Sequence, residues 1–258
     1  MSEWDGKVAL VTGGTSGIGR EASVLFARKG VKVVVAGRRE DEGIATVDLI
    51  RRAGGEGLFV KTDVSRASDV EALIDQAVNT FGGLDYAFNN AGIEGKWAPI
   101  VKQTEADWDR TIDINLKGTW LCLKFEIQQM VKQGREGVIV NNSSISGFIG
   151  SYGTATYAAS KHGVLGLTKA AALEVARHKI RVNAVCPAAI ETPMAERLFG
   201  PPGVRKTVLG FYPMGRFGEP IEVAEAVLWM CSSAAGFMTG QSLVLDGGFL
   251  AGPNVPGD

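Results

Sequence analysis

A tyrosine and a lysine four residues apart, Tyr157 and Lys161, could move a proton to or from a substrate. In a helix this spacing puts both side chains on one face. An unperturbed tyrosine has a pKa of about 10, and a nearby ammonium group favours the phenolate and lowers that pKa. Ser143 and Ser144 end an expected strand, where a hydroxyl could hydrogen-bond a substrate oxygen. A tyrosine–lysine pair alone also occurs on ordinary helix surfaces, so it needs support from the rest of the chain.

The glycine-rich stretch TGGTSGIG, residues 12–19, could hold a phosphate group. Gly13, Gly17 and Gly19 leave the backbone bare where the first expected strand turns into a helix. Free N–H groups at a helix N-terminus, helped by the helix dipole, bind a pyrophosphate. The alternative is an ordinary glycine-rich turn. The position at the first strand-to-helix turn favours nucleotide binding.

A regular alternation of strands and helices would position these groups. Apolar, β-branched runs are typical of strands buried on both faces. Strands that alternate with helices indicate right-handed βαβ units, so the sequence predicts a single α/β domain with a doubly wound, Rossmann-type parallel sheet of seven strands. The expected strands are 7–12, 31–37, 57–62, 84–88, 137–142, 180–186 and 242–246, and the expected helices are 17–29, 40–53, 67–81, 105–131, 155–178 and 219–232. The irregular stretch at about 188–218 is too long for a plain connection and predicts a substrate lid.

Composition excludes several classes of protein. The chain has 258 residues, and its hydrophobic fraction of 45% excludes a disordered chain. A net charge of −1 excludes the basic field of a nucleic-acid partner, and no apolar run is long enough to span a membrane. Three scattered cysteines, Cys122, Cys186 and Cys231, predict reduced thiols in a cytoplasmic protein. Neither they nor the two histidines have the spacing of a metal site.

Together the motifs resemble those of the short-chain dehydrogenase/reductase family, in its short single-domain branch. The glycine loop has the spacing TGxxxGxG, and NNAG (89–92), YAASK (157–161) and DGG (246–248) follow in the order usual for that family. The resemblance covers nearly the whole chain. It implies an oxidoreductase that transfers a hydride between a nicotinamide cofactor and a small ketone or secondary alcohol, without a metal.

The resemblance also implies a role for each matching residue. Tyr157 would be the general acid/base, Ser144, thirteen positions earlier, would hydrogen-bond the substrate oxygen, and Lys161 would also bind the nicotinamide ribose. Asn115 would bind a water in a proton relay from Lys161 to solvent; the alternative is a polar residue that bends a long helix. For Asp63 the alternative to adenine binding is a capping role. The other residues expected to contact the cofactor are Gly13, Thr15, Ser16, Gly17, Ile18, Gly19, Val64, Asn89, Ala91, Gly92, Pro187, Ile190 and Thr192.

The end of the second strand predicts which nicotinamide cofactor is used. An NAD-binding fold holds the ribose 2′-hydroxyl with an acidic residue there. Here Gly37 stands at that position and Arg38 and Arg39 follow. Since a guanidinium pairs well with a phosphate, we expect NADP(H) to be favoured over NAD(H). Alternatively, the arginines are solvated charges and Glu40 or Asp41 serves NAD.

The substrate side is less defined by sequence. Apolar residues in the lid and in the loop after Ser144 suit a hydrophobic or mid-sized ketone, although each could simply pack the lid. Glu94 is a candidate polar determinant. The residues expected around the substrate are Ser144, Tyr157, Ser146, Phe148, Tyr152, Met194 and Phe199.

Position 188 departs from the family pattern, because Ala188 replaces a usual glycine. If the backbone there needs a positive φ, alanine carries strain. By resemblance, we also expect a homotetramer with the apolar C-terminal end at an interface. Two other functions stay open: a catalytically idle dinucleotide-binding sensor or scaffold, and a lyase or epimerase on the same fold.

Overall fold

The computed structural model describes residues 2–252 and is built on one parallel sheet with the strand order β3-β2-β1-β4-β5-β6-β7. Most strand residues are buried, as the apolar runs predict. The strands are β1 (Val8–Thr12), β2 (Lys32–Gly37), β3 (Gly57–Lys61), β4 (Tyr86–Asn89), β5 (Gly137–Asn142), β6 (Ile180–Pro187) and β7 (Ser242–Leu245).

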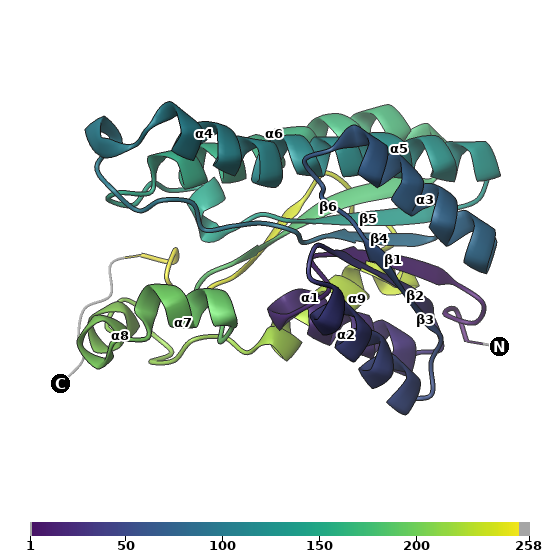
Figure 1. Cartoon of the computed structure of the whole chain (residues 1–258), viewed down its shortest axis with the longest axis horizontal. Coiled ribbons are helices and arrows are strands. Elements are labelled where there is room, and N and C mark those ends of the chain that lie inside the picture. The colour runs from purple at the N-terminus through teal and green to yellow at the C-terminus, as the bar shows by residue number, and fades with distance from the viewer. Residues whose placement is uncertain (1, 253–258) are drawn as a thin grey trace.

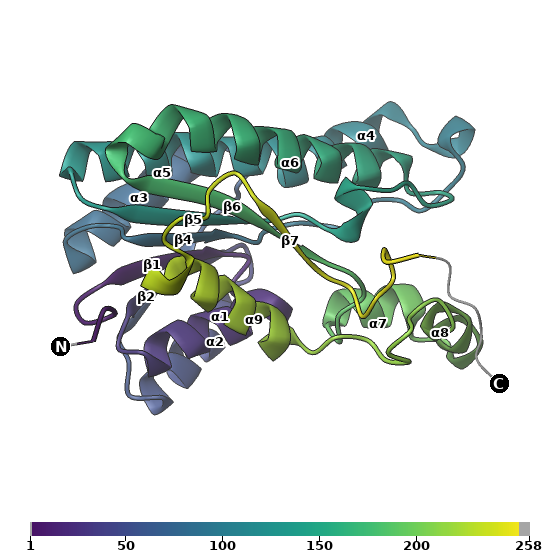
Figure 2. The same cartoon turned by 180° about the vertical axis from the view of Figure 1, so that it is seen from behind.

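Helices cover both faces of the sheet. The layer of α3, α4, α5 and α6 lies on one face, and α1, α2 and α9 lie on the other (Figures 1 and 2). None of the helices in the described residues is long and apolar enough to cross a membrane. The helices are α1 (Gly17–Arg28), α2 (Glu40–Arg52), α3 (Ala67–Phe81), α4 (Glu105–Ile112), α5 (Gly118–Gln133), α6 (Ala155–Val175), α7 (Pro193–Phe199), α8 (Pro202–Leu209) and α9 (Pro220–Cys231).

The order of the strands fixes where the candidate site must form. The chain runs from β1 outward to β3, then crosses back so that β4 pairs with β1 on the other side. Thr12 is in register with Asn89, and Asn89 with Asn141. The carboxyl ends of β1, β4 and β5 therefore meet at the point where the winding direction reverses, which is where doubly wound sheets bind ligands.

The predicted fold class is confirmed, and two local expectations are wrong. The helix expected over 105–131 is α4 and α5 joined by a π-helical turn, Asp113–Lys117. The expected irregular stretch 188–218, called here the lid segment, contains the two short helices α7 and α8. Each begins with a proline in its first turn, and Thr192 caps α7 through a hydrogen bond from the backbone N–H of Ala195.

A buried polar cluster lies between the sheet and α5. Glu126 is fully buried, and its Oε2 accepts a hydrogen bond of 2.9 Å from Nδ2 of Asn89, which also donates to Oδ1 of Asn141. Burial raises the pKa of Glu126 to about 8, although the hydrogen bond from Asn89 lowers it in part. Oε1 of Glu126 and Oδ1 of Asn89 have no hydrogen-bond partner within the described residues. A protonated Glu126 fits this cluster because it brings a donor to a group of acceptors.

Replacing Glu126 by Gln should flatten the dependence of stability on pH. The native carboxyl keeps its proton up to a pH of about 8, whereas an ordinary carboxyl loses it near 4.5. The free energy of unfolding of the wild type should therefore fall as pH rises from about 4.5 to about 8. Gln cannot ionise, so Glu126→Gln should be more stable at pH 8 by on the order of a few kcal/mol. Urea unfolding across this pH range measures the slope.

The exposed Glu225 on α9 provides the matched control. Glu225→Gln should leave the pH slope as it is in the wild type. An unchanged slope in Glu126→Gln would contradict the assignment of this proton to Glu126.

Candidate active site

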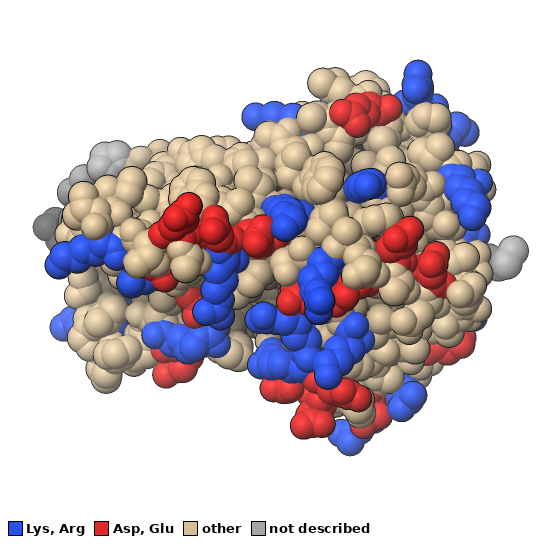
Figure 3. Space-filling view, turned by 45° about the horizontal axis from the view of Figure 1, so that its top comes forward, with Lys and Arg blue, Asp and Glu red and all other residues tan. Residues whose placement is uncertain are grey.

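The sites predicted from sequence converge on one cavity of about 880 Å³ at the carboxyl ends of the strands. One end is lined by the glycine loop and Arg38, the middle by Tyr157 and Lys161, and the other end by α7. The face drawn in Figure 3 is hollowed, and Lys and Arg side chains stand on both sides of the hollow. The cavity therefore extends from the glycine loop to α7.

The glycine loop leaves no room for side chains. Gly13 and Gly17 have φ values of +64° and +52°. An added Cβ at Gly13 would lie 2.9 Å from Cα of Ala91, and one at Gly19 would lie 2.5 Å from both the carbonyl oxygen of Gly13 and Nδ2 of Asn90. Helix α1 begins here without a side-chain cap on its N-terminal N–H groups. Such an uncapped terminus beside a bare loop can accept a phosphate.

The arginine pair follows the second strand at one end of the cavity. Arg39 donates hydrogen bonds to Oγ1 of Thr15 (2.9 Å) and Oγ of Ser16 (2.7 Å), so it lies over the glycine loop. An added Cβ at Gly37 would lie 2.6 Å from Cγ2 of Thr15. An acidic side chain at Gly37 would therefore require Thr15 to move.

Asp63 lies near the same arginines. Burial opposes its charged form, but hydrogen bonds from Ser65 and the charges of Arg38 and Arg66 outweigh burial and lower the pKa of Asp63 below its ordinary value. Its Oδ1 accepts hydrogen bonds from the backbone N–H and the hydroxyl of Ser65. Asp63 thus remains ionised at this end of the cavity.

Hydrogen bonds join the ends of three strands to α6. Nδ2 of Asn90 donates to the carbonyl oxygens of Thr12 (3.1 Å) and Gly13 (3.2 Å), and Oδ1 of Asn90 accepts from Nδ2 of Asn142 (2.8 Å). The carbonyl oxygen of Asn142 in turn accepts from Nζ of Lys161 (2.8 Å). The positions of the glycine loop and of Lys161 are therefore coupled through two asparagines that the sequence analysis did not single out.

Tyr157 and Lys161 lie together on α6, as their spacing predicts. Nζ of Lys161 lies 5.6 Å from the centre of the Tyr157 ring. The expectation that Lys161 lowers the pKa of Tyr157 is wrong for this arrangement: burial raises that pKa to about 12, and the charge of Glu94 adds to the rise while Ser144 opposes it. Burial also lowers the pKa of Lys161 to about 8. Nζ of Lys161 donates a hydrogen bond to the carbonyl oxygen of Asn142.

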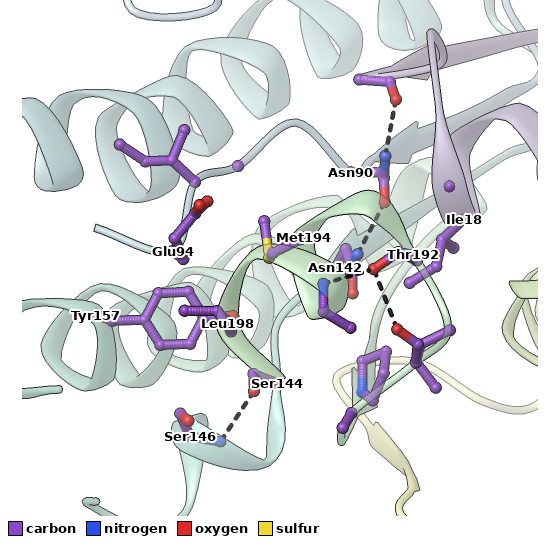
Figure 4. Close-up of a pocket in the computed structure, with 18 of the residues that line it drawn as sticks. Ile18, Asn90, Glu94, Asn142, Ser144, Ser146, Tyr157, Thr192, Met194 and Leu198 are labelled. Carbon is purple, nitrogen blue, oxygen red and sulfur yellow. Dashed lines mark hydrogen bonds between the residues drawn. The ribbon is translucent and has the colours of Figure 1, made fainter. Parts of the chain in front are cut away.

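The two serines have different surroundings. The Ser143 hydroxyl donates to the carbonyl oxygen of Lys161 (2.9 Å), so it ties the end of β5 to α6. The Ser144 hydroxyl accepts from the backbone N–H of Ser146 (3.1 Å; Figure 4) and lowers the pKa of Tyr157 by hydrogen bonding. Ser144 is therefore the serine whose hydroxyl acts on Tyr157.

Asn115 lies in the π-helical turn, behind the cavity wall. Its Oδ1 accepts from the backbone N–H of Ile93 (2.8 Å), and its Nδ2 donates to the carbonyl of Ile93 (2.9 Å) and to Oγ of Ser160 (3.2 Å). An added Cβ at Gly92 would lie 3.3 Å from Oδ1 of Asn115 and 3.7 Å from Nζ of Lys161. Gly92 thus keeps the space between Asn115 and Lys161 free of a side chain.

The lid segment closes the substrate end of the cavity. Phe199 on α7 packs edge-on against Trp97, with their ring centres 5.8 Å apart. Met194 and Leu198 of the same helix line the cavity beside Tyr157 (Figure 4). Ala188 does not have a positive φ, so alanine at this position carries no backbone strain.

Most of the expected site residues line the cavity, and four do not. Asn89 belongs to the buried cluster around Glu126, Gly19 lies behind Gly13, and Asn115 is buried in its helix. Phe148 is about half exposed and does not line the cavity. The cavity is also lined by Asn90, Asn142 and Phe249, which the sequence analysis did not single out. The two asparagines stand at strand ends, and this position could have indicated them. No local sequence pattern indicates Phe249. The expected residues that line the cavity are Gly13, Thr15, Ser16, Gly17, Ile18, Arg38, Arg39, Asp63, Val64, Ala91, Gly92, Ser144, Ser146, Tyr152, Tyr157, Lys161, Pro187, Ile190, Thr192, Met194 and Phe199.

The cavity fits a nicotinamide dinucleotide. The bare glycine loop at the start of α1 suits its pyrophosphate, and the cavity continues from there past Lys161 to the segment around Thr192. Between residues 2 and 252, no cluster of three or more His, Cys, Asp or Glu side chains could hold a metal ion.

Known proteins resemble this chain over nearly its full length. A family model described as enoyl-(acyl carrier protein) reductase matches residues 13–250. A 2,5-dichloro-2,5-cyclohexadiene-1,4-diol dehydrogenase from Sphingobium indicum is 41% identical over 97% of this chain and 100% of its own length. A cyclohexanol dehydrogenase from an Acinetobacter species is 40% identical over 96% of each chain. A crystal structure of NAD⁺-bound xylitol dehydrogenase superposes with a TM-score of 0.91 at 31% identity, covering 95% of this chain and 99% of that one.

Replacing Gly19 by Ala should weaken nucleotide binding. The new methyl group would meet the carbonyl of Gly13 and the side chain of Asn90 at about the same short distance, so the loop would have to shift. We expect the Kd for NADPH to rise at least tenfold and the melting temperature to fall. Gly166 on α6 has open space around it and is the control, because Gly166→Ala should stabilise the helix by about 0.5–1 kcal/mol without changing the Kd. Equal nucleotide affinity in Gly19→Ala and the wild type would refute this account of the loop.

Proposed function

This chain belongs to the short-chain dehydrogenase/reductase family, and we propose that it transfers a hydride between NADP(H) and a ketone or secondary alcohol, with Tyr157 as the general acid/base. As a member of this family it is an oxidoreductase that acts on alcohols and ketones. The observation that carries the proposal is the convergence of Ser144, Tyr157 and Lys161 on a cavity whose other end is a glycine loop.

The proposed proton chemistry follows from the burial of these residues. The bound nicotinamide supplies the hydride in reduction and takes it up in oxidation. Since the pKa of Tyr157 is about 12, its hydroxyl keeps the proton that it gives to the substrate oxygen when a ketone is reduced. Ser144 holds that oxygen with a hydrogen bond. In the reverse direction Tyr157 first gives up its proton through the relay that includes Lys161, and the phenolate then takes the proton of the alcohol.

Lys161 and Asn115 are proposed to exchange that proton with solvent. The pKa of Lys161 is about 8, so its amine can gain or lose a proton near neutral pH. Asn115 lies across the open space beside Gly92, where its Oδ1 faces the same gap as Nζ of Lys161. A water between them would complete the relay.

The preference for NADP(H) rests on charge around the adenosine end of the cavity. Arg38 lines the cavity there, and Arg39 lies over the glycine loop. Glu40, the acidic residue nearest the strand end, forms an ion pair with Lys61 at 3.5 Å. The guanidinium groups of Arg38 and Arg39 favour a 2′-phosphate over a free ribose hydroxyl as the recognised group. NAD(H) is the alternative, because the xylitol dehydrogenase neighbour is NAD⁺-bound.

We also propose a homotetramer in the cytoplasm with a neutral, mid-sized substrate. Large apolar side chains are exposed, among them Trp120 on α5, Leu173 on α6 and Phe237 in a turn after α9, and an interface would cover them. All three cysteines are buried and unpaired, as expected in a reducing compartment. The end of the expected interface at 253–258 lies outside the described residues.

Tyr157→Phe tests the proposed activity. With NADPH and a panel of ketones, or NADP⁺ and alcohols, the wild type should change the absorbance of the nicotinamide. Tyr157→Phe should lose at least about a hundredfold of this turnover, because the proton donor is gone, while the Kd for NADPH stays the same. Retained turnover would refute the role of Tyr157. If the wild type binds nucleotide but turns over nothing in either direction, the protein is an idle sensor or scaffold; product formed without net cofactor change identifies a lyase or epimerase.

Arg38→Asp tests the cofactor preference. The ratio of kcat/KM for NADPH to that for NADH should fall at least tenfold, because a carboxylate would repel the 2′-phosphate. Arg66→Asp is the control, since Arg66 also acts on Asp63 but does not line the cavity. A ratio that falls equally in both variants would show a general charge effect and not a contact with Arg38.

A further inference from the structure

The loop after β4 presents a carboxylate to the substrate end of the cavity. Glu94 accepts two hydrogen bonds from Arg197 on α7, from Nε to Oε1 (2.9 Å) and from Nη2 to Oε2 (3.2 Å). The Glu94 side chain is 21% exposed and that of Arg197 is 58% exposed. The carboxylate is thus the inner partner of this pair, and the guanidinium is the outer one.

Glu94 is held as an anion with acceptor capacity left over. Burial raises its pKa, but the hydrogen bond and charge of Arg197 and the charge of Arg110 outweigh burial and hold that pKa below its ordinary value. Two carboxylate oxygens offer about four acceptor positions. Arg197 fills one position on each oxygen and the backbone N–H of Glu94 takes a third, so the carboxylate keeps acceptor capacity for a donor in the cavity that it lines.

The surroundings of Glu94 connect it to the reacting group. The negative charge of Glu94 helps to raise the pKa of Tyr157. Met194 and Leu198 line the same cavity as Glu94 and Tyr157, and Figure 4 labels all four side chains. A substrate held at Tyr157 would therefore meet apolar surface and, beside it, a carboxylate able to accept a proton donor.

We propose that Glu94 recognises a second hydroxyl group on the substrate, so that the protein prefers diols and polyols to monohydric alcohols of the same carbon skeleton. This inference rests on the proposed oxidoreductase function. A monohydric alcohol would displace water from Glu94 without replacing its hydrogen bond, which costs affinity. A carboxylated substrate would be repelled by the same charge. Arg197 is a positioning residue, because it fixes the carboxylate without facing the reacting oxygen.

The test compares cyclohexanol with cyclohexane-1,2-diol, -1,3-diol and -1,4-diol as substrates of the full-length protein. At least one diol should exceed cyclohexanol in kcat/KM, and Glu94→Gln should reduce that ratio tenfold or more. Arg197→Met should reduce the ratio as well, and Arg197→Lys should restore part of it. Glu196→Gln, one residue earlier on α7 and outside the cavity lining, is the control and should keep the wild-type ratio.

Two results would overturn the inference. One is a wild type that shows no preference for any diol, and the other is an unchanged ratio in Glu94→Gln. Turnover and recognition are measured separately: calorimetric titration of the same alcohols into the protein with NADP⁺ reports on Glu94 even if no alcohol is oxidised. A complete lack of turnover would contradict the proposed function, whereas diol binding that Glu94→Gln weakens would still support the role of Glu94.

Discussion

The amide group of Asn90 is the contact on which the rest of the site depends. Its Nδ2 reaches the carbonyls of Thr12 and Gly13, and its Oδ1 receives Asn142. The glycine loop, the end of β4 and the end of β5 are thereby held in one arrangement, to which Lys161 is added through the Asn142 carbonyl. Because this amide lies where a side chain at Gly13 or Gly19 would have to go, part of the need for glycine comes from the protein's own packing.

Burial shifts the pKa values of Tyr157 and Lys161 more than the charges of neighbouring groups do. The tyrosine–lysine spacing suggests a phenol acidified by an ammonium group, but the pKa of Tyr157 rises and that of Lys161 falls. Both shifts have desolvation as their largest cause. The hydrogen bond that Lys161 donates goes to the carbonyl of Asn142.

The sequence was informative where local pattern decides structure. Valine-rich runs predicted β1 and β2, and the glycine spacing and the pair Tyr157–Lys161 placed one end and the middle of the cavity. Long-range packing decided the rest. The exposure of Phe148, the arrival of Phe249 at the cavity wall and the burial of Glu126 depend on segments far apart in the chain. Helix α7 had a local signal, because Thr192 is its cap and Pro193 follows. The helices of the lid segment are so short that this signal alone does not predict them.

The lid segment leaves and rejoins the body at a single narrow neck. Gly218 donates its N–H to the carbonyl of Ala189 (3.0 Å) and accepts from the N–H of Glu191 (2.8 Å), so the two ends are paired like neighbouring strands. The entropy that is lost when the two ends of the segment are brought together depends only weakly on the number of residues between them. Helices α7 and α8 between these ends could therefore be exchanged for other helices that redirect the enzyme to new molecules, as long as the contacts of α7 with Glu94 and Trp97 are replaced.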